Sequence, residues 1–468
     1  MTHVSKDAAD LSRRTALTGL AGGAGVLLAG GCTPPGATSA QGPTPSRTGS
    51  ATGSADGATP GVMTLFKDPG FNFNGLLALG AAGQGAGELG EVLTAVNEIN
   101  KAGPSAQTYT GTFKNLGDQL MGAPVASKAG TETTRLRALR ASQYYGQALF
   151  FVLGSDDPGG EERLYRSGRR GWDTFCRLSD PPPVTADVPY GRTPLPVWFF
   201  RPDDSGERRP TVILTNGSDG QNVDMWTYGV QAALERGWNA LVYDGPGQGQ
   251  LLFVDRVVFT PRWETVVTPL VDWLVARTDV DADRIALTGL SMAGDLAPRA
   301  ASFENRIAAL VAMPGVLAPW LGFPPEIRKI LTPDKAETND IWNKQVVPEL
   351  TPAEAATLKK RFEPFSAPTM LAARDGKFTD FYTPAQLIKS LDITDVVGRI
   401  KMPTLVLDYD YEQFYPGQPR QMFDKLTSPK DYVKLTAATG AQLHCSPMAP
   451  QQHCEVVFDW LQETLPGR

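Results

Sequence analysis

The segment Gly289-Leu-Ser-Met-Ala-Gly294 contains the residue best suited to covalent chemistry, Ser291. An apolar run over residues 284–288 precedes it, and a helical pattern over 295–302 follows. Where a strand turns sharply into a helix around G-x-S-x-A, small neighbours permit a strained bend that lifts the serine hydroxyl above the sheet. The pattern predicts that Ser291 is a nucleophile. Alone it is a weak signal in a chain with 48 glycines, so its partners matter.

A serine hydroxyl needs a neighbouring base, because it is a poor nucleophile at neutral pH until an imidazole accepts its proton. The chain has only three histidines. His444 follows the last strand-like run, in the loop where the base of such an arrangement is expected. His453 falls in a helical pattern over 450–461, and His3 lies in a segment that resembles an export signal. The sequence therefore favours His444 as the base.

The acid that orients this imidazole should lie between the serine and the histidine, after the strand before the last. That strand is expected over 404–407, and three carboxylates follow it, those of Asp408, Asp410 and Glu412. Glu412 stands four residues before Pro416, which is a common register for the acid in such a loop. Glu412 is the preferred acid and Asp410 is the alternative. The carboxylates that do not act are expected to be solvated.

Two glycine-rich turns follow strand-like runs further upstream. The first, Asn216-Gly-Ser-Asp-Gly220, could place the backbone N–H of Ser218 or Asp219 near that of Met292. Such donors bind the negative oxygen that develops during acyl transfer, although an ordinary glycine turn is the alternative. The second, Asp244-Gly-Pro-Gly-Gln-Gly249, has no G-K-[ST] after it and no downstream acid, which excludes a nucleotide-binding loop.

In this order, the motifs resemble those of the α/β-hydrolase superfamily. Within it they are most similar to the branch of 2,6-dihydroxypseudooxynicotine hydrolase and related bacterial and fungal enzymes. The resemblance covers about residues 185–465. It is carried by the two glycine turns, the serine segment with Pro298-Arg299 after it, the Glu412-Gln-Phe-Tyr-Pro-Gly417 loop and the His444-Cys445 pair.

The resemblance implies Ser291 as nucleophile, Glu412 as acid and His444 as base. It also implies a helical cap ahead of the sheet, and hydrolysis of esters, amides or carbon–carbon bonds next to a ketone. Two positions depart from the pattern: Ala293 stands where glycine is frequent, and Asp295 stands where an aromatic residue is frequent. Asp295 is expected to place a charge near the mouth of the site, so the substrate specificity of the branch does not carry over.

The elements that must hold these residues alternate between strands and helices. Strands are expected over 193–202, 211–217, 240–245, 284–290, 308–315, 404–409 and 431–437, with helical patterns between them that include 223–236 and 261–277. This alternation predicts an α/β fold in which a mostly parallel sheet has helices on both faces.

Two long segments lie outside this alternation. Residues 62–183 show helical patterns, over 88–100, 131–153 and 161–178, and are predicted to form a helical cap region. Residues 317–397 interrupt the core and are predicted to form an inserted lid that includes a helix over 352–362. The α/β-hydrolase core is then 184–316 together with 398–468. Both additions are expected above the carboxyl ends of the strands, where this architecture keeps its site.

The beginning of the chain resembles an export signal. Ser12-Arg13-Arg14 and the apolar, glycine-rich stretch after it predict a twin-arginine signal peptide over 1–32. The stretch is too short and too rich in glycine for a membrane span. Cys32 is the expected lipidation site, and a secreted protein without lipid is the alternative. Residues 33–61 consist mostly of Thr, Pro, Gly, Ser and Ala, and are expected to form a disordered spacer.

Composition excludes several partners. A net charge of −6 and an isoelectric point near 5.3 argue against nucleic acid and against electrostatic binding to anionic membranes. Membrane contact is therefore expected only through a lipid anchor. The four cysteines have no metal-ligand spacing, and no metal or cofactor is expected. Cys445 and Cys454 could form a bridge or remain reduced. The sequence does not determine the oligomeric state.

Together these features predict an extracytoplasmic serine hydrolase that cleaves an ester, or an amide, of a fairly hydrophobic small molecule. One alternative keeps the same three residues but cleaves a carbon–carbon bond or transfers an acyl group, acting on a polyketide-like or β-diketone substrate. A second alternative is an inactive binding lipoprotein. The intact serine, histidine and glutamate count against it.

Overall fold

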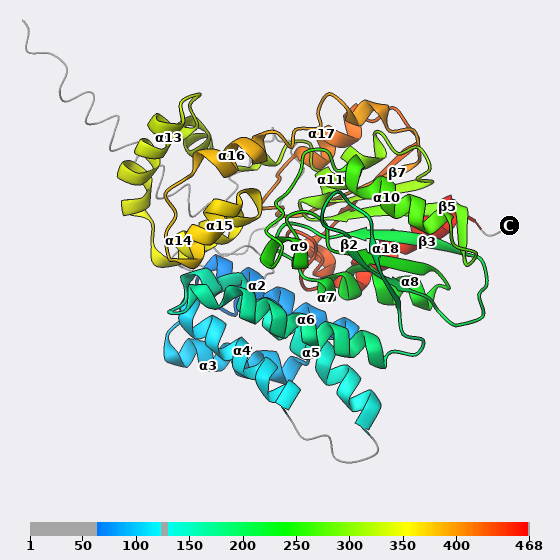
Figure 1. Cartoon of the computed structure of the whole chain (residues 1–468), viewed down its shortest axis with the longest axis horizontal. Coiled ribbons are helices and arrows are strands. Elements are labelled where there is room, and N and C mark those ends of the chain that lie inside the picture. Colours follow the sequence, from blue (N-terminus) through cyan, green and yellow to red (C-terminus); the bar gives the residue numbers. More distant parts are fainter. Residues whose placement is uncertain (1–62, 123–129, 467–468) are drawn as a thin grey trace, which may run out of the picture.

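The computed structural model describes residues 63–122 and 130–466, and its centre is an eight-stranded sheet (Figure 1). The strands lie in the order β1-β2-β4-β3-β5-β6-β7-β8. Their bounds are Val184–Val188 (β1), Leu195–Phe200 (β2), Arg209–Thr215 (β3), Asn239–Tyr243 (β4), Val280–Leu290 (β5), Ala309–Met313 (β6), Thr404–Tyr409 (β7) and Lys430–Leu435 (β8).

From β4 to β8 every neighbouring pair is parallel, and β1 and β2 add an antiparallel edge. The mostly parallel sheet is therefore confirmed. The short strand β1 was not predicted, because only its last residue is fully buried and its sequence has no continuous apolar run. In the register of β3 against β5, Thr215 pairs with Gly289. This pairing sets the turn after β3 beside the turn that contains Ser291.

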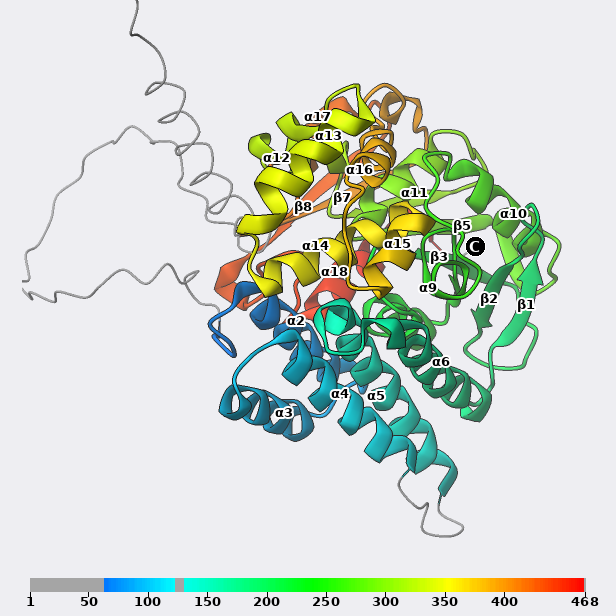
Figure 2. The same ribbon diagram turned by 60° about the vertical axis from the view of Figure 1, so that its left-hand side comes forward.

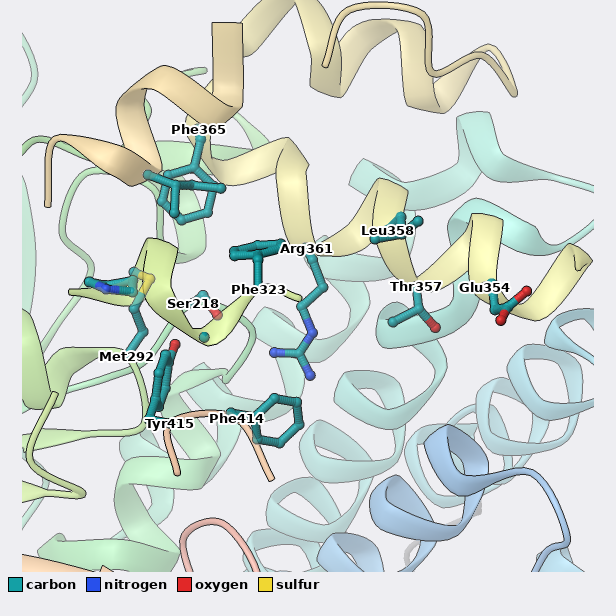
Figure 3. A pocket seen from close by; sticks show the side chains of 13 residues that line it. Ser218, Met292, Phe323, Glu354, Thr357, Leu358, Arg361, Phe365, Phe414 and Tyr415 are labelled. Atoms are coloured by element: carbon teal, nitrogen blue, oxygen red, sulfur yellow. The ribbon is translucent and has the colours of Figure 1, made fainter. Parts of the chain in front are cut away.

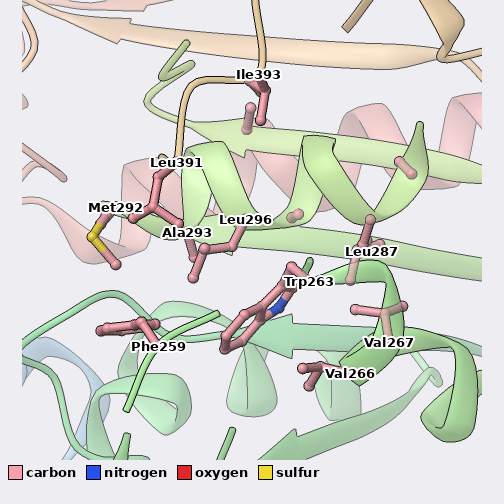
Figure 4. Packing of buried hydrophobic residues seen from close by; sticks show 14 of the residues in the cluster. Phe259, Trp263, Val266, Val267, Leu287, Met292, Ala293, Leu296, Leu391 and Ile393 are labelled. Carbon is pink, nitrogen blue, oxygen red and sulfur yellow. The ribbon is translucent and has the colours of Figure 1, made fainter. Parts of the chain in front are cut away.

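Helices cover both faces of the sheet because alternate strand residues point to opposite sides. Ile213 belongs to one core cluster, whereas its neighbours Val212 and Leu214 belong to the other. The first face is covered by α10 (Glu264–Val275), α11 (Ala293–Ala301) and α17 (Gln418–Lys425). The second is covered by α7 (Asn222–Met225), α8 (Gln231–Glu235) and α18 (Pro450–Thr464). Figure 4 shows the packing between α10 and α11, where Trp263 lies near Leu296.

A bundle of helices precedes the sheet in sequence and lies against one side of it (Figure 1). Its helices are α2 (Pro69–Gly80), α3 (Leu89–Ala102), α4 (Ala106–Gly122), α5 (Gly130–Phe151) and α6 (Glu161–Leu178). Their aromatic side chains form a separate core, in which Tyr109 stacks on Phe71 with ring centroids 5.5 Å apart. We call residues 63–122 and 130–178 the cap.

The segment between β6 and β7 forms a second helical layer, drawn in yellow in Figure 2. Its helices are α12 (Pro325–Ile330), α13 (Lys335–Ile341), α14 (Pro352–Phe362), α15 (Ala367–Arg374) and α16 (Tyr382–Lys389), and a separate short helix, α9 (Gly249–Phe253), follows β4. Thr351 and Glu354 form a capping box at the start of α14. This reciprocal bonding satisfies backbone donors that a helix start leaves open. We call residues 317–397 the lid.

Buried charges join the lid to the cap. Lys360 Nζ in α14 lies 2.6 Å from Glu363 Oε1 and 3.4 Å from Glu161 Oε1 at the start of α6. Arg374 Nε, from α15, lies 2.8 Å from Glu161 Oε2. The side chains of Lys360, Glu161 and Glu363 are at most 2% exposed. Because a buried charge is costly without its partner, this cluster fixes how the lid sits on the cap.

In the described ranges, no helix combines the length and the apolar character that a bilayer crossing requires. The predicted signal peptide, Cys32 and the predicted spacer lie outside the described residues.

Candidate active site

Ser291 sits at a tight bend between β5 and α11. Its φ of 59° lies in the left-handed region, which L-residues with a side chain rarely adopt. A Cβ on Gly289 would lie 1.9 Å from the carbonyl oxygen of Ala293, and one on Gly294 would lie 1.8 Å from that of Pro314. Both positions therefore require glycine. The observed backbone is the strained strand-to-helix turn expected from the sequence.

Ser291, His444 and Glu412 form a continuous hydrogen-bonded line. His444 Nε2 lies 2.8 Å from Ser291 Oγ, and His444 Nδ1 lies 2.9 Å from each carboxylate oxygen of Glu412. The backbone N–H groups of Phe414 and Tyr415 donate to Glu412 Oε1 at 2.9 and 3.1 Å. His444 is 4% exposed and Glu412 is 5% exposed. These two backbone hydrogen bonds fix the Glu412 carboxylate, which can therefore hold the imidazole with Nε2 toward the serine.

The other two carboxylates of the β7 loop bind elsewhere. Asp410 accepts the Ala437 N–H and lies 3.2 Å from Lys434 Nζ, and Asp408 accepts the Tyr432 hydroxyl at 2.6 Å. The structure therefore brings Glu412, and not the alternative acid Asp410, against the imidazole. Neither aspartate is a freely solvated loop charge, because both bind residues on or beside β8.

The surroundings of His444 favour its protonated form. Burial lowers the pKa of the imidazole, but neighbouring Cys445 and the Glu412 carboxylate raise it, and the net effect is an increase from 6.5 to about 10. Phe414 lies edge-on to the ring with centroids 4.7 Å apart, and Tyr415 lies 5.8 Å away. These aromatic rings exclude water from the imidazole and leave its Nε2 facing the serine.

Backbone donors for a developing oxyanion lie beside Ser291. Within the described residues, neither the Ser218 N–H nor the Met292 N–H donates to a protein acceptor. Both residues line the same cavity. The side chain of Asp219 faces the lid, where its Oδ2 pairs with Arg361 Nη1 at 2.5 Å. The lid therefore contacts the loop whose N–H groups are the candidate oxyanion donors.

Two cavities lie beside the candidate nucleophile, one lined by its chain neighbour Met292 and the other by Ser291 itself. The first lies under the lid and is lined mainly by apolar side chains, among them Phe323, Leu358 and Phe365 (Figure 3). We call it the lid cavity. The second lies against the cap and is lined by Ser291 and His444 together with several amide side chains. We call it the cap cavity.

Arg361 and Phe414 border both cavities. The guanidinium carbon of Arg361 lies 4.6 Å from the centroid of the Phe414 ring, and Figure 3 shows the two side chains facing each other. Arg361 was not predicted as a site residue, since the expected helix over 352–362 does not reveal which of its faces turns toward the site. The amides of the cap cavity were missed for a similar reason.

The geometry answers two expectations about polar residues, the state of a cysteine pair and the charge of Asp295. Cys445 and Cys454 are free thiols whose sulfurs donate to the carbonyls of Met313 and Thr227, so of the two open alternatives the structure has the reduced pair. Asp295 is 1% exposed, and burial raises the pKa of its carboxyl well above the ordinary value. The expected charge at the mouth of the site is therefore wrong, because the first turn of α11 points this side chain into the protein.

The order of the strands, the bend at Ser291 and the loops after β7 and β8 define an α/β-hydrolase fold. Among solved structures, the chain is similar to the crystal structure of 2,6-dihydroxy-pseudo-oxynicotine hydrolase, with a TM-score of 0.57 and 18% identity over 83% of this chain and 95% of that one. It is also similar to AbyA5, with a TM-score of 0.54 and 16% identity over 79% of this chain and 88% of that one. These likenesses confirm the predicted fold.

Curated relatives agree with this assignment, although no family model matches the chain. The α/β hydrolase psoB of Aspergillus fumigatus is 30% identical over 265 residues, which is 54% of this chain and 59% of psoB. The hydrolyase poxO of Penicillium oxalicum is 25% identical over 359 residues, which is 73% of this chain and 83% of poxO. The chain thus spans about three fifths of the length of psoB. The predicted resemblance to α/β-hydrolases is confirmed.

Proposed function

We propose that this protein is a serine hydrolase that cleaves an ester, or an amide, of a small molecule through an acyl-enzyme. The observation that carries the proposal is the line from Ser291 through His444 to the buried Glu412, with contacts of 2.8 and 2.9 Å. A nucleophile, a base and an orienting acid within hydrogen-bond reach are the parts that acyl transfer requires.

In the proposed reaction, His444 accepts the proton of Ser291 Oγ as this oxygen attacks the substrate carbonyl. The negative oxygen of the tetrahedral intermediate accepts hydrogen bonds from the N–H groups of Ser218 and Met292. His444 then donates its proton to the leaving oxygen or nitrogen, and the acyl group stays on the serine. A water molecule, deprotonated by the same imidazole, attacks the acyl-enzyme and releases the acid.

The two cavities divide the substrate between them. The leaving group must lie beside His444, because this residue protonates it, and His444 lines the cap cavity. The acyl part then extends past the candidate oxyanion donors Ser218 and Met292 into the lid cavity. Since the lid cavity is mainly apolar, we infer a hydrophobic acyl group.

Labelling with a fluorophosphonate tests this proposal. The reagent phosphonylates an activated serine, so we expect one covalent adduct, at Ser291, located by peptide mass spectrometry. Butyrate and octanoate esters of p-nitrophenol should be hydrolysed in the same preparation. Failure to label, together with no hydrolysis of either ester, would leave the inactive binding protein as the better assignment.

Carbon–carbon cleavage and acyl transfer would use the same three residues. Mass analysis of the products separates them, since an ester hydrolase releases an acid and an alcohol, and a β-diketone hydrolase releases an acid and a ketone. An acyltransferase gives a new ester only when an acceptor alcohol is present. We place ester hydrolysis first because the cap cavity offers polar groups to an oxygen-bearing leaving group.

The pH dependence of kcat/KM should follow His444. Only the neutral imidazole accepts the serine proton, and its pKa is raised above 6.5, so activity should rise with pH with a midpoint above 6.5. Glu412→Gln removes a negative charge that favours the imidazolium and should move this midpoint downward. Asp410→Asn is the matched control, because Asp410 binds the Ala437 N–H and not the imidazole. An identical midpoint in Glu412→Gln and the wild type would contradict the assignment of the acid.

We further propose that the protein acts outside the cytoplasm, tethered through Cys32. This rests on the twin-arginine pattern at Arg13-Arg14 and on the cysteine that ends the apolar stretch. Fractionation of cells that express the full chain tests it. Cys32→Ser should move the protein from the membrane to the soluble exported fraction, and a cytoplasmic wild-type protein would rule the proposal out.

A further inference from the structure

The cap cavity contains a buried hydrogen-bond acceptor without a partner. Gln143, on α5, is only 2% exposed, and its Oε1 has no hydrogen-bond partner. Its amide donates to the Asp224 carboxylate, which also accepts the Gln221 N–H at 2.7 Å. This contact fixes the amide with Nε2 toward Asp224 and leaves Oε1 as the free atom. An unpaired buried acceptor is costly, and such groups in native proteins call for an explanation.

A complementary donor lies one helical turn away. Gln147 is also on α5 and lines the same cavity, and its Oε1 accepts the Tyr109 hydroxyl at 2.9 Å. Residues four apart share one face of a helix. The Gln147 amide nitrogen, whose carbonyl oxygen is taken by Tyr109, forms no hydrogen bond with another described residue. The wall of the cavity therefore offers an acceptor from Gln143 and a donor from Gln147, close together.

A hydroxyl group fits this pair, because a hydroxyl both donates and accepts. A carboxylate does not fit, since it has no proton for Gln143 Oε1 and would lie near the Asp224 carboxylate. A purely apolar group would leave both amides without partners. Burial raises the pKa of Asp224 to about 6, although its side chain keeps partial exposure.

We propose that the cap cavity is a binding subsite for a leaving group that carries a free hydroxyl, with Gln143 and Gln147 as its specificity-determining residues. The subsite rests on the proposed function, because the proton from His444 places the leaving group on the cap side. The substrate is then an ester that joins an apolar acyl group to a diol, a polyol or a hydroxyphenol.

Matched esters test the subsite. One pair is 1-glyceryl butyrate and n-propyl butyrate, and the other is 3-hydroxyphenyl butyrate and phenyl butyrate. Within each pair the acyl group and the carbon skeleton are the same, and only free hydroxyls differ. A well-placed hydrogen bond to a buried group supports a preference of about tenfold or more in kcat/KM for the hydroxylated member of at least one pair.

Gln143→Leu should remove this preference by lowering kcat/KM for the hydroxylated ester about tenfold, with the other ester unchanged. Gln119→Leu, at an exposed position of α4, is the matched control and should keep the wild-type ratio. Should Gln143→Leu fail to fold, Gln147→Met removes the donor of the same pair and should give the same loss.

The rate of fluorophosphonate labelling separates the two possible failures. A wild-type ratio near one in both pairs, or a preference that survives in Gln143→Leu, overturns the subsite while normal labelling leaves the proposed function in place. Absence of labelling and of hydrolysis for all four esters overturns the proposed function itself.

Discussion

Ser291→Ala is expected to lower the hydrolysis of every ester tested by about 10⁴-fold or more. The substitution removes the oxygen that lies 2.8 Å from His444 Nε2, and no other hydroxyl of the described residues forms a hydrogen bond with that nitrogen. Ser291 already has a left-handed backbone that alanine can occupy at a similar cost, so the melting temperature should change little. Initial rates at saturating substrate and a thermal melt measure the two quantities.

Ser302→Ala is the matched control for this variant. Ser302 directly follows α11, the helix that begins after Ser291, and its Oγ donates to the Pro298 carbonyl at 2.8 Å, away from both cavities. Its activity should stay within about twofold of the wild type. The double variant Ser291→Ala/His444→Ala should be no slower than either single variant, because residues that act as a unit are not additive. More than a tenth of the wild-type rate in Ser291→Ala would show that another group attacks the carbonyl.

Lys360→Met should cost about 3–5 kcal/mol of the free energy of unfolding, since it leaves buried carboxylates without their cation. Lys360 Nζ lies 2.6 Å from Glu363 Oε1, and burial and the charge of Glu161 already raise the pKa of Glu363. Methionine keeps the length and the apolar part of the side chain, so the loss reports on the charge. Urea unfolding monitored by tryptophan fluorescence measures it.

The control for Lys360→Met is Lys344→Met. Lys344 forms a salt bridge with Asp340 one helical turn away, and the two side chains are 71% and 56% exposed. Such a surface pair contributes less than about 1 kcal/mol, so this variant should unfold close to the wild type. Equal midpoints for the two methionine variants would contradict the idea that the buried cluster fixes the lid on the cap.

The sequence predicted the parts of the site that depend on local motifs. The tight bend at Ser291 leaves no room for side chains on its neighbours, and Gly289 and Gly294 make this requirement visible in the sequence. The order of Ser291, Glu412 and His444 along the chain follows from the order of the strands in a parallel sheet. The helix at 161–178 was predicted with the bounds that α6 has, because its apolar residues recur at helical spacing.

The walls of the two cavities could not be predicted in this way. On α5, residues 138 and 139, 141–145 and 147–151 are all buried, so no polar face marks the side on which Gln143 meets the cavity. For Arg361, the position depends on how the lid packs over the sheet, a long-range arrangement without a local signature. The edge strand β1 could not be predicted either. It is a strand because it pairs with β2, and this long-range pairing has no signal in the local sequence.

The three residues of the candidate reaction centre all follow strands of the sheet, whereas the cap and the lid each add a wall to one of the two cavities. Substitutions in the cap and the lid alone can therefore change the substrate specificity, while the reaction at Ser291 stays the same. Selection would preserve one part of the chain and diversify the other. Sequence similarity between two such proteins in the sheet region alone is then a poor guide to whether they share a substrate.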